Sequence, residues 1–447
     1  MKKAAGHLTV ILKGILLIGF GIQIILGLIW MCFNFPHLQE FSQPSGILYR
    51  GLAGLAGERY GILYALQLGL GLWAGYRLLG SLGAAGIVCR LGGSFAILTF
   101  PMAIQCHLAV SPYSLVSSLL LLELSGALTA VRKEERAVRE LALAGFCWLL
   151  LALLLPEYFI LGAAPIVLAL LFGFPALRKR PAGLWRGLLL FAAFGGVIVG
   201  IQTLAGEEDY LPDRESVAFS LCSRMTWPTA FPDFPDWPEE VQEVVGDTTA
   251  WEVSRYPDNM QTILRPIMRE NFDDAQAAEY YLEMAAFSLK RHTPMVIRQT
   301  GGDFVSYLVT PLILPMQLRG ETYASYSGRN YEYMFLHTPV LTKYYVNYGC
   351  WWFAVMLGIT AVLTLIRGLA DFPGLSRKGA ACVLLCLLWA VLTAALYTMR
   401  GAGIMDYKCT VAVNLLWLVW AVLTLGKRDA AESGEGGNGE EAEGKTV

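Results

Sequence analysis

Charged residues are scarce in this chain of 447 residues, because only 16% are Asp, Glu, Lys or Arg while 55% are hydrophobic. Soluble domains carry about a quarter charged residues to cover their surface, so the composition excludes an ordinary soluble enzyme. The mean hydropathy is +0.50. This balance indicates an integral membrane protein that crosses the bilayer many times.

Several chemical motifs are also absent. The chain has no Walker loop, no H-E-x-x-H, no C-x-x-C pair with zinc spacing and no G-x-S-x-G elbow. Its five histidines are scattered without the spacing of metal ligands, and its nine cysteines lie mostly inside apolar runs. We therefore expect no metal, no cofactor and no disulfide framework.

Apolar runs long enough to cross roughly 30 Å of hydrocarbon are what the chain has in abundance. One stretch, 141–175, is too long for a single crossing and is interrupted by "PEY" (156–158), so we expect two short helices there. With the eight single runs, this predicts an all-α polytopic membrane protein of about ten transmembrane helices. The single runs are 9–34, 61–79, 91–109, 113–131, 187–205, 345–366, 380–398 and 409–426.

Lysine and arginine are distributed unequally around these runs. If the N-terminus is inside, seventeen basic residues flank the runs on the cytoplasmic side, against four in the short outer loops. The positive-inside rule then predicts that both termini are cytoplasmic. The basic start "MKK", followed by a run too long for a signal-peptide core, indicates a retained signal anchor.

One sizeable hydrophilic segment, 206–344, is then predicted to be extracytoplasmic. Acidic residues outnumber basic ones in it by 21 to 11, which argues against a nucleic-acid surface. No strand pattern occurs there, so we expect a helical cap over the membrane part. The apolar but short stretch 304–318 is expected to stay on the outer face without crossing.

Two parts of this segment have readable patterns. "SRMTWPTAFPDFPDWPEE" (223–240) is rich in proline and aromatic residues, so we expect irregular structure with Trp227 and Trp237 packed in a small core. "DDAQAAEYYLEMAAFSLKRHTP" (273–294) predicts an amphipathic helix that begins at its acids and ends at Pro294.

The chain is thus expected to have four regions. They are an N-terminal bundle of about seven spans at 1–205 with a first outer loop at 35–60, the segment 206–344 with membrane-proximal helices, three spans at 345–426, and a disordered acidic cytoplasmic tail at 427–447.

Charged residues at membrane depth are costly and therefore informative. Glu123 lies inside a run, and we expect it to be paired within the bundle, for instance with Arg90. Glu157 lies in a tight outer turn, where a solvated and a functional residue are equally compatible with the sequence. The last outer loop, "TMRGAGIMDYK" (398–408), holds two cations and an acid that suit either a bound phosphate or interfacial anchoring.

The first outer loop has a distinctive order of residues. Glu40 in "LQEF" is followed by "ILYRGLAG" and then by "RYGILYAL", which opens the second run. This order resembles the GT-C membrane glycosyltransferases, the class of protein O-mannosyltransferases and lipid A aminoarabinose transferases. "YYLEMAAFSLKRHTPMVIRQTGGDFVSYLVTP" (280–311) resembles the membrane-proximal helices of bacterial members. The loop departs from the family in having Gln39-Glu40 in place of Asp-Glu or Asp-x-Asp, and Tyr60-Gly61 in place of Pro-Pro or Tyr-Pro.

The resemblance implies an enzyme of the bacterial plasma membrane that transfers a sugar from a polyprenyl-phosphate donor to an acceptor on the outer face. Its partners would be the lipid-linked donor and membrane lipids, with no nucleic acid. Glu40 would be the catalytic general base, although a surface loop acid is the alternative. The expected substrate-binding residues are Tyr49, Arg50, His107, Glu157, Arg400, Asp406 and Lys408. The competing functions are a non-catalytic envelope assembly protein and a transporter or flippase of lipid-linked saccharide.

Overall fold

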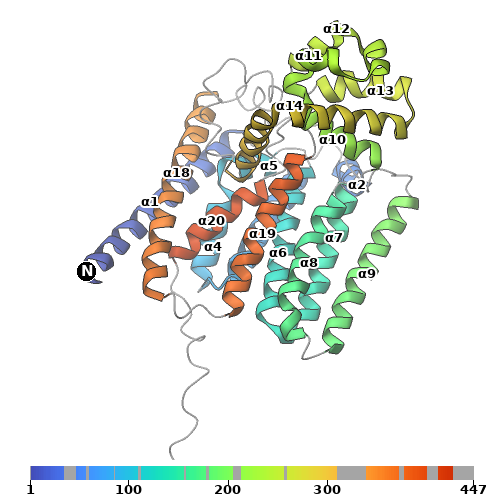
Figure 1. The fold of residues 1–447 in the computed structure, drawn as a ribbon. Coiled ribbons are helices and arrows are strands. Elements are labelled where there is room, and N and C mark those ends of the chain that lie inside the picture. The colour runs from blue at the N-terminus through green and yellow to red at the C-terminus, as the bar shows by residue number, and fades with distance from the viewer. Residues whose placement is uncertain are drawn as a thin grey trace, which may run out of the picture.

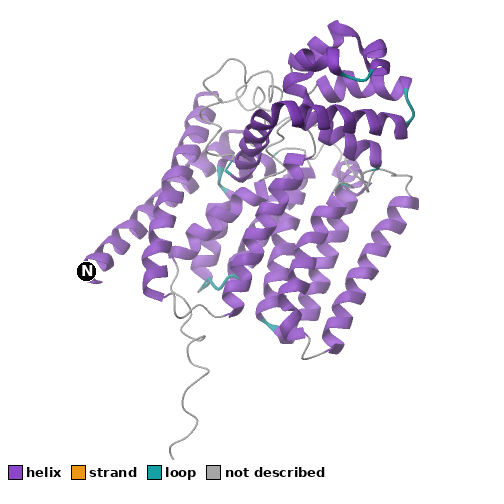
Figure 2. Ribbon diagram, in the orientation of Figure 1, coloured by secondary structure: helices purple, strands orange, loops and turns teal. Residues whose placement is uncertain are grey.

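The structure is a computed structural model, and nearly all of the residues that it describes are helical. No strand occurs among them (Figure 2), so the predicted all-α class is confirmed for this part of the chain. The described residues are 2–34, 47–56, 60–84, 86–108, 112–155, 158–177, 181–204, 213–255, 259–309, 339–371, 377–399 and 411–425.

Apolar helices lie side by side in one bundle (Figure 1). In the described part of the chain, seven helices are long and apolar enough to cross a membrane, and three further apolar helices are shorter. This supports a membrane protein, while the number of ten crossings remains a prediction. The bundle consists of α1 (Lys2–Asn34), α2 (Ile47–Ala56), α3 (Tyr60–Ser81), α4 (Ile87–Leu98), α5 (Pro101–His107), α6 (Pro112–Arg132), α7 (Ala137–Leu154), α8 (Tyr158–Leu177), α9 (Pro181–Leu204), α18 (Pro339–Asp371), α19 (Arg377–Met399) and α20 (Val411–Leu425).

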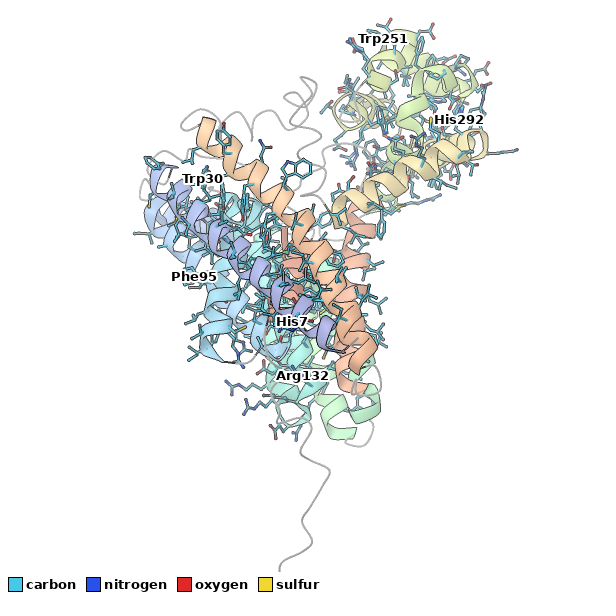
Figure 3. All side chains as sticks on the ribbon, turned by 90° about the vertical axis from the view of Figure 1, so that its left-hand side faces the viewer. His7, Trp30, Phe95, Arg132, Trp251 and His292 are labelled. Carbon is cyan, nitrogen blue, oxygen red and sulfur yellow. The ribbon has the colours of Figure 1, made fainter. Side chains whose placement is uncertain are left out.

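Helix α6 lies at the centre of this bundle, packed against α3, α7, α8 and α19. Gly126 allows α7 to approach closely, since a Cβ added there would lie 2.9 Å from the carbonyl oxygen of Glu140. At the end of the bundle away from α14, where Figure 3 shows Arg132, the Arg132 Nη1 donates to the Ser81 carbonyl oxygen at 2.6 Å. Nearby, Arg77 Nη2 and Glu140 Oε2 form an ion pair at 2.7 Å. These contacts hold α6 and α7 against α3.

The run 91–109 is not the one continuous helix expected from the sequence, because the structure divides it into α4 and α5. The reason is Pro101, which has no N–H to continue a helix and suits the first turn of a new one. At the break, the Phe100 N–H donates to the Ile97 carbonyl oxygen at 3.3 Å. In a continuous α-helix it would donate to the Ala96 carbonyl oxygen.

Side chains of other helices satisfy two carbonyl groups at this break. Gln23 of α1 donates its amide N–H to the Ala96 oxygen, which Phe100 leaves without its usual partner. Tyr345 of α18 donates its hydroxyl to the Thr99 oxygen. Backbone groups at membrane depth require partners because no water is present to supply them. The broken helix is therefore supported by α1 and α18.

The expected pairing of Glu123 with Arg90 is also wrong. The Arg90 Nε donates to the Ala84 carbonyl oxygen at 2.9 Å, and the guanidinium lies 5.9 Å from the ring centre of Tyr76. The physical reason is the start of α4 at Ile87, which puts Arg90 in the first turn of that helix, whereas Glu123 lies in the middle of α6.

A helical lobe, residues 213–309, stands on one end of the bundle (Figure 1). It has its own hydrophobic core, separate from that of the bundle. Its residues lie within the stretch 206–344, whose role as an extracytoplasmic cap stays a prediction. The lobe consists of α10 (Arg214–Thr226), α11 (Ala230–Asp233), α12 (Glu239–Arg255), a π-helical turn (Met260–Leu264), α13 (Arg265–Asn271) and α14 (Asp274–Leu308), with short 3₁₀ turns at Trp227–Thr229 and Phe234–Asp236.

The proline-rich stretch 223–240 forms single helical turns in place of the irregular structure that we expected. Pro228 and Pro235 lie within the first two positions of the two 3₁₀ turns, where a missing N–H costs nothing. The expected core packing of the tryptophans is confirmed: Trp237 is buried, and Trp227 is partly buried against the same core.

A buried ion cluster joins α10 to α13. The fully buried Glu215 carboxylate accepts from Arg265 Nε at 3.0 Å and Nη2 at 2.6 Å, and from Arg269 Nη2 at 2.8 Å. Burial acts to raise the pKa of Glu215, but the hydrogen bonds and charges of the two arginines together outweigh it, so the pKa is lowered. Glu215 is thus an ionised group with its partners in place.

Helix α14 begins as predicted and continues further than predicted. Asp273 caps it by accepting from the Gln276 N–H at 2.8 Å. Pro294 bends the helix without ending it: His292 leaves helical geometry with φ −121° and ψ 30°, and the helix continues to Leu308. The proline therefore sits at the start of a second segment, which is a position it tolerates.

The bend is held by Asp233 at the end of α11, whose carboxylate is almost fully buried. It accepts from His292 Nε2 at 2.9 Å and from the Ser288 hydroxyl at 3.4 Å. Figure 3 shows His292 in the lobe, well away from Arg132. Because these contacts fix the bend, they direct the second segment of α14 back onto the bundle. Of the stretch 304–318, only 304–309 belongs to the described residues, and the tail 427–447 lies outside them.

Candidate functional site

The end of the bundle next to the lobe brings together the helix ends that adjoin several of the predicted site residues. Helices α2 and α5 lie at this end, close to the lobe (Figure 1). The second segment of α14 packs against α19 and α20, and α19 packs against α8. Three regions that are distant in sequence, namely α8, α14 and the pair α19 and α20, therefore meet here.

Three buried tyrosines form the centre of this junction. The hydroxyl groups of Tyr158, in the first turn of α8, and Tyr397, near the end of α19, hydrogen-bond to each other. The Tyr307 ring of α14 packs on Tyr397 with ring centres 5.8 Å apart. The adjoining Leu308 accepts at its carbonyl oxygen from Trp417 Nε1 at 2.9 Å. These contacts attach the end of α14, and with it the lobe, to α19 and α20.

An ion pair lies one helical turn from this junction. Arg224 of α10, which is buried, donates to the Asp303 carboxylate of α14. Burial is the larger influence on Asp303 and raises the pKa of its carboxyl, while the charge and hydrogen bond of Arg224 act against it. This pair holds α10 against the second segment of α14.

Two predicted site residues adjoin the tyrosine contact along the chain, although both lie outside the described residues. Glu157 directly precedes Tyr158, and Arg400 follows Tyr397 by three residues. The structure therefore brings together the helix ends next to these two residues, which are more than 200 positions apart in sequence. Their roles stay predictions.

Tyr49 and Arg50 lie on α2, which packs against α3 and α7. Successive residues of a helix point about 100° apart, and here the Tyr49 side chain is buried while Arg50 is exposed. Arg50 is therefore accessible at this end of the bundle, as a residue that binds an anionic group must be.

His107 lies at the end of α5 and contacts Ser114 in the first turn of α6. Its Nδ1 is 2.7 Å from the Ser114 Oγ, and both side chains are buried. Gly71 of α3 makes room for the imidazole, since an added Cβ would lie 2.7 Å from Nε2. In this structure His107 is buried where α3, α5 and α6 meet, and its contact with a substrate stays a prediction.

The remaining predicted site residues, Glu40, Asp406 and Lys408, lie outside the described residues. In the described ranges, no group of three or more His, Cys, Asp or Glu side chains is arranged to hold a metal ion.

Sequence reasoning missed the tyrosine junction. The only available signal was that Tyr158 in "PEY" and Tyr397 in "LYTMR" each lie at the end of an apolar run next to a predicted site residue. Tyrosine is common at such ends because its ring is apolar and its hydroxyl is polar. This signal does not say which two tyrosines meet.

Comparisons of the chain with families of known proteins, with curated proteins and with solved structures find no match.

Proposed function

We propose that this chain is a membrane glycosyltransferase that transfers a sugar from a polyprenyl-phosphate donor to an acceptor on the outer face of the cell membrane. The observation that carries the proposal is the convergence at the lobe-facing end of the bundle. There the start of α8, the end of α19 and the second segment of α14 meet, and α2 lies at the same end of the bundle (Figure 1). A reaction between a lipid-borne donor and a water-side acceptor requires a site at such a boundary.

In this proposal the bundle makes ten crossings, both termini are cytoplasmic, and the lobe is extracytoplasmic. The seven long and three shorter apolar helices among the described residues supply the required number. Arg77, Arg132 and the other basic residues at the bundle end away from the lobe then lie on the cytoplasmic side, as the positive-inside rule requires.

The proposed chemistry is an inverting transfer. Glu40 takes the proton of the acceptor hydroxyl as its oxygen attacks the anomeric carbon. The bond from that carbon to the phosphate oxygen breaks, and the polyprenyl phosphate leaves with the electron pair. Arg400 and Lys408 stabilise the charge that develops on the phosphate. Tyr49, Arg50, His107, Glu157 and Asp406 complete the substrate contacts.

The test uses the full chain in lipid nanodiscs. Polyprenyl phosphate should co-purify and be identified by mass spectrometry, and a radiolabelled polyprenyl-phosphate hexose should lose its sugar to envelope acceptors. Loss of a general base costs on the order of 10²–10⁴ in rate, so Glu40→Gln should reduce transfer by that factor.

Glu58→Gln is the matched control, because Glu58 is the other acid of the same loop. Equal activity of the two variants would exclude Glu40 as the base. Absence of both bound polyprenyl phosphate and transfer would refute the enzyme itself.

Transport of a lipid-linked saccharide is a second candidate, which one observation favours: Glu123 lies in the middle of the central helix α6. Coupling ions often bind carboxylates near the middle of the membrane. In vesicles, a transporter would lose flux in Glu123→Gln and keep it in Glu40→Gln, which is the opposite of the result expected for a transferase.

A further inference from the structure

Glu123 lies near the midpoint of the most buried helix of the bundle. Helix α6 runs from Pro112 to Arg132 over 21 residues, which is about 31 Å at 1.5 Å per residue. That length matches the roughly 30 Å of hydrocarbon in a bilayer. Glu123 is eleven residues from one end and nine from the other, so its side chain lies far from both ends.

The Glu123 carboxyl group has no partner among the described residues. Its side chain is 0% exposed, and neither Oε1 nor Oε2 has a hydrogen-bond partner in this part of the structure. An ionised carboxylate in such surroundings, with no cation and no donor, is strongly disfavoured relative to its neutral form. The group therefore carries its proton in this arrangement.

The helices around α6 offer few charged groups to Glu123. On α7, the buried Cys147 thiol is close enough to interact electrostatically with both Glu123 and Arg77. Arg77 of α3 is the nearby cation, but it is already paired with Glu140 at 2.7 Å. The described parts of α8 and α20 contain no Asp, Glu, Lys or Arg, and α19 contributes Cys382 and Tyr397 as its buried titratable groups.

We propose that Glu123 is a proton-binding site inside the bundle, and that its neutral carboxylic acid is the position at which a hydrophobic carbodiimide modifies this chain. The site is separate from the tyrosine junction: Ser114, at the lobe-facing end of α6, lies about 14 Å from Glu123 along the helix axis. Its existence does not depend on glycosyl transfer.

The modification follows from the protonated state. The acid proton moves to a carbodiimide nitrogen, and the carboxylate oxygen adds to the central carbon to give an O-acylisourea. The acyl group then shifts to nitrogen, which gives a stable N-acylurea. The reaction is an addition, so it needs no oxidant, reductant or leaving group. A solvated glutamate is ionised at neutral pH and does not start it.

The experiment treats the full chain in nanodiscs with dicyclohexylcarbodiimide at neutral pH, followed by peptide mass mapping. One adduct is expected on the peptide that contains Glu123, and the adduct should be lost in Glu123→Gln. Glu135→Gln is the control, because Glu135 is an exposed acid in the link between α6 and α7, and it should leave the adduct unchanged. A charged, water-soluble carbodiimide should not modify Glu123, because a charged group is strongly disfavoured in the apolar interior of the bundle.

Infrared spectroscopy gives a second readout that does not use the reagent. The carbonyl stretch of a protonated carboxyl should be present at neutral pH in the wild type and absent in Glu123→Gln. If that variant does not fold, peptide mapping of the wild type still decides the matter. An unmodified Glu123 peptide, or an adduct that persists in a folded Glu123→Gln, would overturn the proposal.

Discussion

The hydroxyl groups of Tyr158 and Tyr397 hydrogen-bond to each other across 239 residues of sequence, and both side chains are buried. The contact joins the first turn of α8 to the last turns of α19, and the Tyr307 ring adds α14 to the same place. Since α14 is the last helix of the lobe, this contact couples the lobe to the two helix ends that adjoin Glu157 and Arg400 in the chain.

Tyr397→Phe tests this coupling. It removes one hydroxyl and keeps the ring packing, so we expect a loss of about 1 kcal/mol, typical of one hydrogen bond. If the proposed function holds, sugar transfer should fall by more than this loss of stability explains, because the ends of α8 and α19 are no longer held together. Thermal unfolding in detergent and the transfer assay measure the two effects.

Tyr344→Phe is the matched control, since Tyr344 is 70% exposed, and it should change neither quantity. A double-mutant cycle with Tyr158→Phe should give a nonzero coupling energy. Equal effects of Tyr397→Phe and Tyr344→Phe would show that the buried contact contributes nothing.

The orientation of the bundle is tested by cysteine accessibility. Single cysteines at Glu134 and Asp236, in a chain whose native cysteines are replaced, are labelled with a membrane-impermeant maleimide on intact cells. Glu134 lies in the link between α6 and α7, and Asp236 lies in the lobe. We expect labelling at 236 only, with labelling at 134 appearing after lysis. Labelling of both positions on intact cells is incompatible with the proposed topology.

The apolar helices were predictable because the bilayer fixes their length. In hydrocarbon, a run of about 20 apolar residues forms a helix, because a helix satisfies the backbone hydrogen bonds within the segment itself. Most of the described helices follow these runs. The start of α14 was readable for a similar reason: Asp273 and Gln276 are three residues apart, and a cap depends on local sequence alone.

The two errors over proline have a common cause. Pro101 and Pro294 each interrupt hydrogen bonding locally, but whether the chain then breaks or bends depends on partners elsewhere. Gln23 and Tyr345 support the break at Pro101, and Asp233 supports the bend near Pro294. These partners lie between 59 and about 250 residues away in sequence, so no local pattern predicts them.

The candidate site likewise has a part that local sequence predicts and a part that depends on contacts between distant residues. The sequence predicts which loops carry chemistry, because cations and acids beside apolar runs are unusual, and that prediction concerns residues outside the described ranges. It did not indicate that Tyr158 meets Tyr397, or that His107 is enclosed with Ser114. Side-chain pairs between helices have no period in the sequence and are decided by packing.

Gly246 divides α12 with φ 71° and ψ 157°, a conformation essentially restricted to glycine. An added Cβ would meet nothing within 4 Å, so the effect of Gly246→Ala is purely one of backbone strain. We expect a loss of roughly 1–3 kcal/mol, measured as increased hydrogen exchange in peptides of α12.

Gly301→Ala provides the opposite case within the same lobe. Gly301 is exposed on α14, and nothing lies within 4 Å of an added Cβ there either. Alanine should therefore stabilise the helix by roughly 0.5–1 kcal/mol. If the two substitutions had the same sign, the backbone geometry at Gly246 would be wrong.

Glu215 makes the stability of the lobe depend on pH in a definite direction. Its pKa in the folded lobe lies below the usual value of 4.5 because of Arg265 and Arg269, which outweigh the effect of burial. A carboxyl with a lowered folded pKa stabilises the fold above its unfolded pKa. That contribution is lost as the pH falls through the unfolded value and then through the folded one. Protection of α10 and α13 should therefore decrease on acidification below about pH 5.

Glu215→Gln should remove this pH-dependent part and cost roughly 1–3 kcal/mol at neutral pH, because two arginines lose their buried acceptor. The measurement is hydrogen exchange of α10 peptides in both proteins at each pH, so that the intrinsic exchange rates cancel. Glu279→Gln is the control, because the Arg214–Glu279 pair of the same lobe is long, at 3.6 Å, and largely exposed. Exposed pairs contribute little, so this variant should follow the wild type at every pH. A Glu215→Gln variant that did the same would show that the buried cluster does not hold α10 to α13.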